Sequence, residues 1–194
     1  MIRSKDTAMI IQKKALQMFR EKGYSNITID DICRAVEIAK STFFYHYKNK
    51  DQLLSSFFDN EYQITPEMFE MIATSDNSWD IFWACISQTV ERSIEAGSEI
   101  ISQIISNDLR DHTDFLVTDM AKFEKVYIDI IRKGQEGRYF INTNDSNFLY
   151  QSALYLIRGF LVKWCIDRGS FNLLESIKDS LISLLGVRQD LIKK

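Results

Sequence analysis

The 194-residue sequence predicts an all-α fold. Glycine and proline, the residues that most often interrupt helices, number only seven and one. Apolar residues recur at intervals of three and four along most segments, which is the period of an amphipathic helix. No pair of segments alternates apolar and polar residues in the way that paired strands do. An apolar fraction of 45% is ordinary for a globular protein, and the chain is long enough to bury a sizeable core.

The first predicted helix covers residues 6–22. Ile11, Ala15 and Phe19 follow one another at intervals of four and therefore lie on one apolar face. Gly23 is a typical residue just after a helix end, so we expect the helix to stop there and residues 24–27 to form a connector.

The second predicted helix is short and begins after Thr28. Threonine is a common N-cap, and Asp31 lies three residues on, where its side chain favours a helix start. Ile29, Ile32 and Val36 share one face, so we expect about two turns of helix.

A tight turn at residues 37–39 precedes a third predicted helix, Lys40–Tyr47, whose inward pair is Phe43 and Tyr47. The remaining side chains of this helix are mostly polar. Two short helices joined by such a turn, at about residues 29–48, are the layout of a helix-turn-helix, in which the second helix enters the DNA major groove.

Further helices are predicted along the rest of the chain. A fourth begins near Lys50 and ends or bends at Pro66, and later ones are expected at about 79–96, 98–107, 113–135, 148–168 and 174–184. The helix 148–168 is apolar almost all round in its second half, so both of its sides must be covered. A core on one side and a second subunit on the other would satisfy this requirement.

Charge is unevenly distributed along the chain, whose net charge is −3. Residues 1–53 hold ten Lys and Arg against six Asp and Glu, whereas the remainder holds 14 against 21. The positive surplus lies where the helix-turn-helix lies, as binding to phosphates requires.

Cysteine spacing and hydropathy favour a cytoplasmic protein without metal. Cys33, Cys85 and Cys165 are odd in number and far apart, so we expect reduced, buried thiols. The only histidines, His46 and His112, stand at no metal-ligand spacing, and neither a metal nor another cofactor is expected. No secretory signal or membrane-spanning segment is expected either.

Three segments of the chain form a specific combination. They are Ile11-x-x-x-Ala15-Leu16-x-x-Phe19-x-x-x-Gly23-Tyr24, then Thr28-x-x-x-Ile32 with Ala35, and finally Lys40-Ser41-Thr42-Phe43-Phe44-Tyr45-His46-Tyr47-x-x-Lys50-x-x-Leu53. Together they resemble the TetR family of bacterial transcription factors over residues 7–54. The resemblance implies a DNA-binding domain at residues 1–49 and an effector-binding and dimerisation domain at 50–194.

Two positions depart from the family pattern. Glu37 stands where the turn usually has glycine, and a positive φ costs such a residue about 1 kcal/mol. Either that strain is tolerated or the turn keeps a negative φ. Phe44 stands where a tyrosine typically donates to a DNA phosphate, so that hydrogen bond is lost.

The resemblance also implies roles for individual side chains at the DNA. Lys40 and Ser41 are the expected base readers, because a lysine there suits guanine O6 and N7, and Arg34 is a weaker candidate. Phe44 belongs to the same DNA-facing set, and the candidates for phosphate contact are Thr28, Thr42, Tyr45, His46 and Lys50. Thr28 is expected to be an N-cap as well, and for Lys50 a merely solvated helix start is an equal alternative.

The later helices are expected to hold the effector pocket and the dimer interface. Because ligand pockets are mostly apolar, the pocket candidates are Trp79, Phe82, Trp83, Met120, Phe123 and Tyr127, although ordinary core positions have the same spacing. The dimer candidates are Tyr155, Gly159, Phe160, Ile177, Leu181 and Leu184.

The sequence therefore predicts a ligand-responsive DNA-binding transcriptional regulator. The expected form is a homodimeric repressor that binds double-stranded operator DNA and leaves it when an apolar or aromatic small molecule binds. The alternative is a helical ligand-binding or scaffolding module that does not bind DNA. An enzyme is not expected, since the sequence has no HExxH, GxSxG or glycine-rich phosphate loop.

Overall fold

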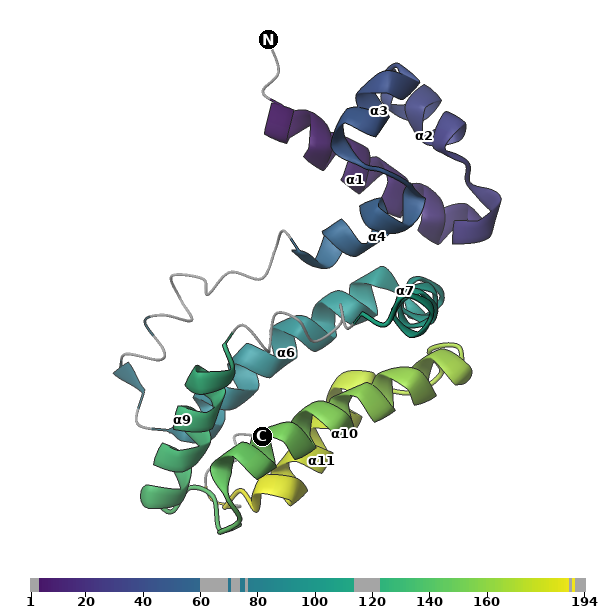
Figure 1. Cartoon of the computed structure of the whole chain (residues 1–194). Coiled ribbons are helices and arrows are strands. Elements are labelled where there is room, and N and C mark those ends of the chain that lie inside the picture. The colour runs from purple at the N-terminus through teal and green to yellow at the C-terminus, as the bar shows by residue number, and fades with distance from the viewer. Residues whose placement is uncertain are drawn as a thin grey trace. The chain divides into compact units, whose positions relative to one another are not determined.

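The computed structural model describes residues 4–59, 70, 74–75, 77–113, 123–188 and 190 (Figure 1). The regular structure of these residues is helical apart from one isolated β-bridge between Phe140 and Val187, so the all-α prediction is confirmed. None of the described helices is long and apolar enough to cross a bilayer.

The chain divides into two compact units. The N-terminal unit comprises residues 1–62 and 96–116, and the C-terminal unit comprises residues 63–95 and 117–194. The expected domain boundary after residue 49 differs from this division, because residues 50–62 and 96–116 group with the N-terminal helices. As a boundary between two functions it stays a prediction.

The N-terminal unit contains α1 (Ser4–Lys22), the short 3-10 helix η1 (Tyr24–Asn26), α2 (Ile29–Val36), α3 (Lys40–His46), α4 (Lys50–Asp59) and α7 (Ser98–Asp111). The first three predicted helices agree with α1, α2 and α3 to within two residues at each end. The predicted helix 98–107 also begins where α7 begins, but α7 continues for one further turn.

The core of the N-terminal unit is built on the apolar face of α1. Ile11 and Ala15 are completely buried and Phe19 is 1% exposed, as their spacing predicts. The Phe19 ring packs edge-on against Tyr24, with ring centroids 4.9 Å apart. Burying an aliphatic or aromatic side chain of this size contributes roughly 1.5–3 kcal/mol, so α1 is a firm base for the shorter helices.

The C-terminal unit contains α6 (Ser78–Ala96, of which the last residue groups with the other unit), α9 (Glu124–Glu136), α10 (Ser146–Ile166) and α11 (Leu173–Leu185). α10 packs against both α9 and α11. Of the expected helix 113–135, Thr113 is described and is not helical, and α9 begins after Phe123. The bend predicted at Pro66 lies outside the described residues.

Candidate functional site

Thr28 is the N-cap of α2, as predicted, and with Asp31 it forms a reciprocal capping box. The N–H of Asp31 donates to Thr28 Oγ1 at 3.2 Å, and the N–H of Thr28 donates to Asp31 Oδ2 at 3.0 Å. The Thr28 hydroxyl donates to the same carboxylate at 2.6 Å. These bonds from Thr28 hold the pKa of Asp31 below its ordinary value. Thr28 is thus an N-cap, and its contact with a DNA phosphate stays a prediction.

The turn between α2 and α3 has a left-handed residue at Glu37, with φ 59° and ψ 43°. The Glu37 N–H donates to Arg34 O at 3.3 Å, and the Ile38 N–H donates to Cys33 O at 3.0 Å. This pair of bonds is the Schellman arrangement that usually has glycine at the left-handed position. Of the two alternatives for this turn, the strained one is therefore found.

α3 is held by its inner face and exposes its outer face. Phe43 is fully buried, Tyr47 is 6% exposed, and the Tyr47 hydroxyl donates to Ala8 O of α1 at 3.1 Å. On the outside, Tyr45 is 76% exposed and Phe44 is 47% exposed. The inward pair that the sequence predicts is confirmed, so the helix presents its other side chains to solvent from a fixed position.

The remaining DNA candidates of α3 lie at or beside this outer face. Ser41 is exposed, and Thr42 and His46 are partly buried. The His46 ring packs edge-on against Tyr45, with centroids 5.0 Å apart. The α3 candidates therefore share one helix, while Thr28, Arg34 and Lys50 come from α2 and α4.

Two basic side chains of the motif are paired with acidic side chains of α2. Lys40 Nζ lies 2.8 Å from Asp30 Oδ1, and both side chains are more than half exposed. This hydrogen bond and charge raise the pKa of Lys40. Arg34 Nη1 lies 3.3 Å from Asp31 Oδ1. Water screens such surface pairs, so a stronger partner can replace either carboxylate.

The ammonium of Lys50 is used inside the N-terminal unit. It donates to Tyr24 O at 2.7 Å and to Ile27 O at 2.9 Å, and it lies 3.9 Å from the centre of the Tyr24 ring. Desolvation lowers the pKa of this lysine. The alternative of a merely solvated helix start is therefore wrong, whereas the phosphate contact stays a prediction.

The sequence did not predict a polar cluster that joins η1, α4 and α7. The Tyr24 hydroxyl donates to Asp51, whose other oxygen lies 3.2 Å from Arg110 Nη2. Glu99 accepts a hydrogen bond from the Tyr24 N–H at 3.2 Å. Burial and the Asp51 carboxylate raise the pKa of Tyr24. These partners lie 27 to 75 residues apart, so no local pattern could have indicated them.

Trp79, Phe82, Trp83 and Tyr127, four of the predicted pocket residues, form an aromatic cluster in the C-terminal unit. Trp79, Phe82 and Tyr127 are at most 2% exposed. The Phe82 and Tyr127 rings meet edge-on with centroids 6.0 Å apart, and Tyr127 stacks on Tyr150. Trp83 and Phe123 are partly buried, and Met120 lies outside the described residues. The cluster fits a packed core, and its contact with an effector stays a prediction.

The predicted dimer residues fall into three groups by exposure. Ile177 and Leu181 have no exposed surface, so including them was wrong: their side chains face the core and offer nothing to a partner. Tyr155 is 64% exposed and Gly159 is exposed. Phe160 and Leu184 are partly buried.

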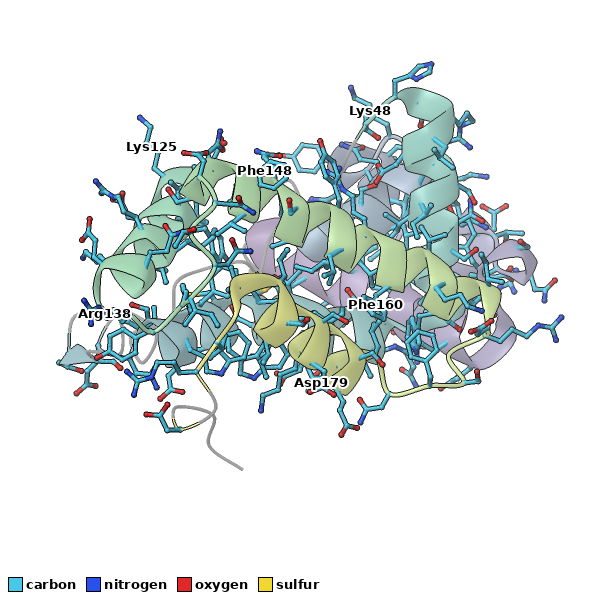
Figure 2. All side chains as sticks on the ribbon, turned by 90° about the horizontal axis from the view of Figure 1, so that it is seen from below. Lys48, Lys125, Arg138, Phe148, Phe160 and Asp179 are labelled. Carbon is cyan, nitrogen blue, oxygen red and sulfur yellow. The ribbon has the colours of Figure 1, made fainter. Side chains whose placement is uncertain are left out.

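The exposed apolar side chains of α10 form one row. Phe148, Tyr155, Val162 and Ile166 are between 41% and 69% exposed. Intervals of seven, seven and four place them on one side of a helix, together with Gly159. Figure 2 displays α10 along its length between the labelled Phe148 and Phe160, with side chains standing out from the ribbon.

The described residues hold no group of three His, Cys, Asp or Glu side chains that fits a metal ion. Each cysteine is a free thiol, and burial raises the pKa of Cys85 and of Cys165 to about 11. Thiolate chemistry at neutral pH is therefore disfavoured at these two positions.

Comparison with known proteins assigns the helix-turn-helix to a family. A family model described as bacterial regulatory proteins, tetR family, matches residues 11–57. The chain is 25% identical over 181 residues to the biofilm operon icaADBC HTH-type negative transcriptional regulator IcaR of Staphylococcus epidermidis, an alignment that covers 89% of this chain and 94% of that protein. It is 30% identical over 151 residues to the uncharacterized HTH-type transcriptional regulator YerO of Bacillus subtilis, covering 77% of this chain and 46% of that protein.

Solved structures share the fold. The fatty acid degradation regulator FadR from Bacillus halodurans matches with a TM-score of 0.67 and 16% identity, over 93% of this chain and 95% of that one. FadR of Thermus thermophilus, a TetR family repressor solved in complex with lauroyl-CoA, matches with a TM-score of 0.65 and 15% identity, over 96% and 99%. At such identities the likeness concerns the fold alone.

Proposed function

Because this chain belongs to the TetR family of bacterial regulatory proteins and is a DNA-binding transcriptional regulator, we propose that it represses transcription from an operator and leaves that DNA when a small molecule binds. In this proposal α3 enters the major groove and the C-terminal unit holds the effector. Two subunits present two copies of α3 about 34–36 Å apart, one turn of duplex.

The outer face of α3 is the observation that carries the proposal. Buried Phe43 and Tyr47 anchor the helix, so Ser41 and Tyr45 face outward from a fixed base. Lys40, more than half exposed at the start of the helix, is the proposed base reader. Thr28, Arg34, Thr42, Phe44, His46 and Lys50 complete the proposed DNA-contacting set. The Lys50 contact requires its ammonium to leave Tyr24 O and Ile27 O.

The DNA upstream of the gene is the natural probe for this proposal. Fluorescence anisotropy should give tight binding whose logarithmic affinity falls linearly with the logarithm of salt concentration. Lys40→Ala should relax the preference at one base position by about 1–3 kcal/mol, if the lysine reads a guanine. Lys133→Ala, an exposed lysine of α9, is the charge-matched control and should leave binding unchanged. Absence of sequence-specific binding at low salt would favour the alternative of a helical module that does not bind DNA.

We propose that the exposed row of α10 is the dimer interface. The row spans 18 residue steps along the helix, from Phe148 to Ile166, which corresponds to roughly 27 Å. Exposed apolar rows of this length on a soluble helix favour burial against another surface. Val162→Asp should convert the dimer to monomer in sedimentation velocity runs, and Lys133→Glu should not. A wild-type monomer at micromolar concentration would contradict the proposal.

The proposed effector is apolar or aromatic and binds in the C-terminal unit, near the aromatic cluster of α6 and α9. Trp79, Phe82 and Tyr127 make this region of the C-terminal unit apolar and aromatic, and one structural neighbour was solved with lauroyl-CoA. Lauroyl-CoA is therefore the first probe. Because coupling between two sites is reciprocal, the effector must weaken operator binding by the same factor by which the operator weakens effector binding. An effector that binds and leaves operator affinity unchanged would contradict release.

A further inference from the structure

Phe44 presents an apolar ring on the outer side of α3. The side chain is 47% exposed, although every atom beyond its backbone is carbon. On its inner side it meets the Phe43 ring in a T-shaped arrangement, at a centroid distance of 5.6 Å and an interplanar angle of 87°. About half of the side-chain surface therefore remains open to solvent. Unlike a tyrosine at this position, it can neither donate to nor accept from a phosphate.

The position of Phe44 on the helix relates it to Lys40. The two residues are four apart, so their side chains lie on the same side of α3, one turn from each other. Four residues advance about 6 Å along a helix, whereas successive base pairs are about 3.4 Å apart. A helix lying in the major groove thus sets Phe44 about two base pairs from the base that Lys40 contacts.

We propose that Phe44 is a specificity residue that contacts the C5-methyl group of a thymine about two base pairs from the Lys40 contact. The inference rests on the proposed DNA-binding function. In the major groove the four bases differ mainly in hydrogen-bond donors and acceptors, and the thymine methyl is the apolar group that distinguishes them. A bare phenyl ring gains from covering a methyl and loses from covering a polar base edge, which it leaves without a partner.

Neighbouring Tyr45 does not take this role. It is 76% exposed and carries a hydroxyl that suits a phosphate oxygen. Its ring lies against His46, also a polar side chain. The apolar contact therefore belongs to Phe44. In place of the phosphate bond that the family's usual tyrosine makes at this position, phenylalanine makes a base contact.

The test removes one methyl group from the DNA. Duplexes bound by the purified full chain are first selected from a random pool, and each thymine of the selected site is then replaced singly by deoxyuridine. Fluorescence anisotropy at fixed salt should give a loss of about fourfold at one thymine of each half-site, the value expected for one buried methyl. Phe44→Ala should bind more weakly and should be insensitive to the same replacement. Phe44→Tyr keeps the ring and should keep the sensitivity.

The outcomes separate this inference from the proposed function. A selected site whose thymines can all be replaced without effect would overturn the thymine contact while leaving DNA binding intact. Sensitivity of the same size in Phe44→Ala would assign the methyl contact to another side chain and would overturn it as well. If no duplex is selected, the proposed function itself fails. Circular dichroism checks that the variants fold, and the deoxyuridine series on the wild-type protein needs no variant.

Discussion

Glu37→Gly should stabilise this protein, although it removes a side chain from the helix-turn-helix. Glu37 has a φ of 59°, and its N–H and that of Ile38 close the end of α2 through bonds to Arg34 O and Cys33 O. Those bonds belong to the backbone, so glycine retains them. What glycine removes is the Cβ, which crowds the backbone in the left-handed region.

The size of the effect follows from two opposing contributions. A left-handed conformation costs a residue with a Cβ roughly 1–2 kcal/mol. Glycine loses more conformational freedom on folding, which costs about 0.5–1 kcal/mol relative to alanine. The net gain in the free energy of unfolding is therefore about 0.5–1 kcal/mol, and in a chain of this size it raises the melting temperature by about 1–4 °C.

Urea titration followed by circular dichroism measures this gain from the shift of the midpoint, provided that the slope stays constant. Glu37→Ala is the matched control, because it removes the carboxylate but keeps the Cβ, and it should give no comparable gain. If Glu37→Gly destabilised the protein, or if alanine stabilised it equally, the strain argument would be refuted and the effect would belong to the carboxylate.

Three further substitutions test the charges and bonds around the motif. Asp30→Asn releases Lys40 and removes a negative charge beside the duplex, so affinity for all sequences should rise and the salt dependence should steepen; weaker binding in anisotropy would contradict this. Thr28→Ala removes a cap worth about 1 kcal/mol. It should raise the pKa of Asp31 towards its ordinary value of 3.8, measured by NMR titration. Because the folded-state pKa of Asp31 is depressed, its stabilising contribution is present above its ordinary value of 3.8 and is lost as pH falls through the folded-state pKa. The difference in the free energy of unfolding between wild type and Thr28→Ala should therefore shrink at acidic pH. Lys50→Met leaves Tyr24 O and Ile27 O without their donor and should lower the free energy of unfolding by roughly 2 kcal/mol. If the slope of log affinity against log salt for DNA binding were unchanged in this variant, Lys50 would contact no phosphate.

Local signals account for how much of the N-terminal unit could be predicted. The Thr28–Asp31 box, the Phe43–Tyr47 pair and the stop at Gly23 each involve residues at most four apart, and all three are found. Helix caps and the apolar face of a helix depend on residues at most four apart, so the local sequence is enough to predict them. The bounds of α1, α2 and α3 were predictable for the same reason.

Contacts between distant segments escaped prediction. Glu99 and Arg110 meet Tyr24 and Asp51 only because α7 folds back onto η1 and α4. Periodicity indicates that a residue is on an apolar face, but not which surface covers that face. Ile177 and Leu181 illustrate this limit, since their spacing fits a helix seam equally well inside one subunit and between two. The pocket candidates share the ambiguity.

The pairing of Lys40 with Asp30 has a consequence for how this protein distinguishes an operator from other DNA. A phosphate that binds Lys40 must first replace the Asp30 carboxylate at 2.8 Å, so one anion exchanges for another and the net gain is small. Arg34 faces the same exchange with Asp31. A guanine edge differs, because it offers two acceptors in a fixed geometry without adding a negative charge beside Asp30. Non-specific affinity should therefore be low for this motif, and base contacts by Lys40 and Phe44 should supply an unusually large share of the binding free energy at the operator.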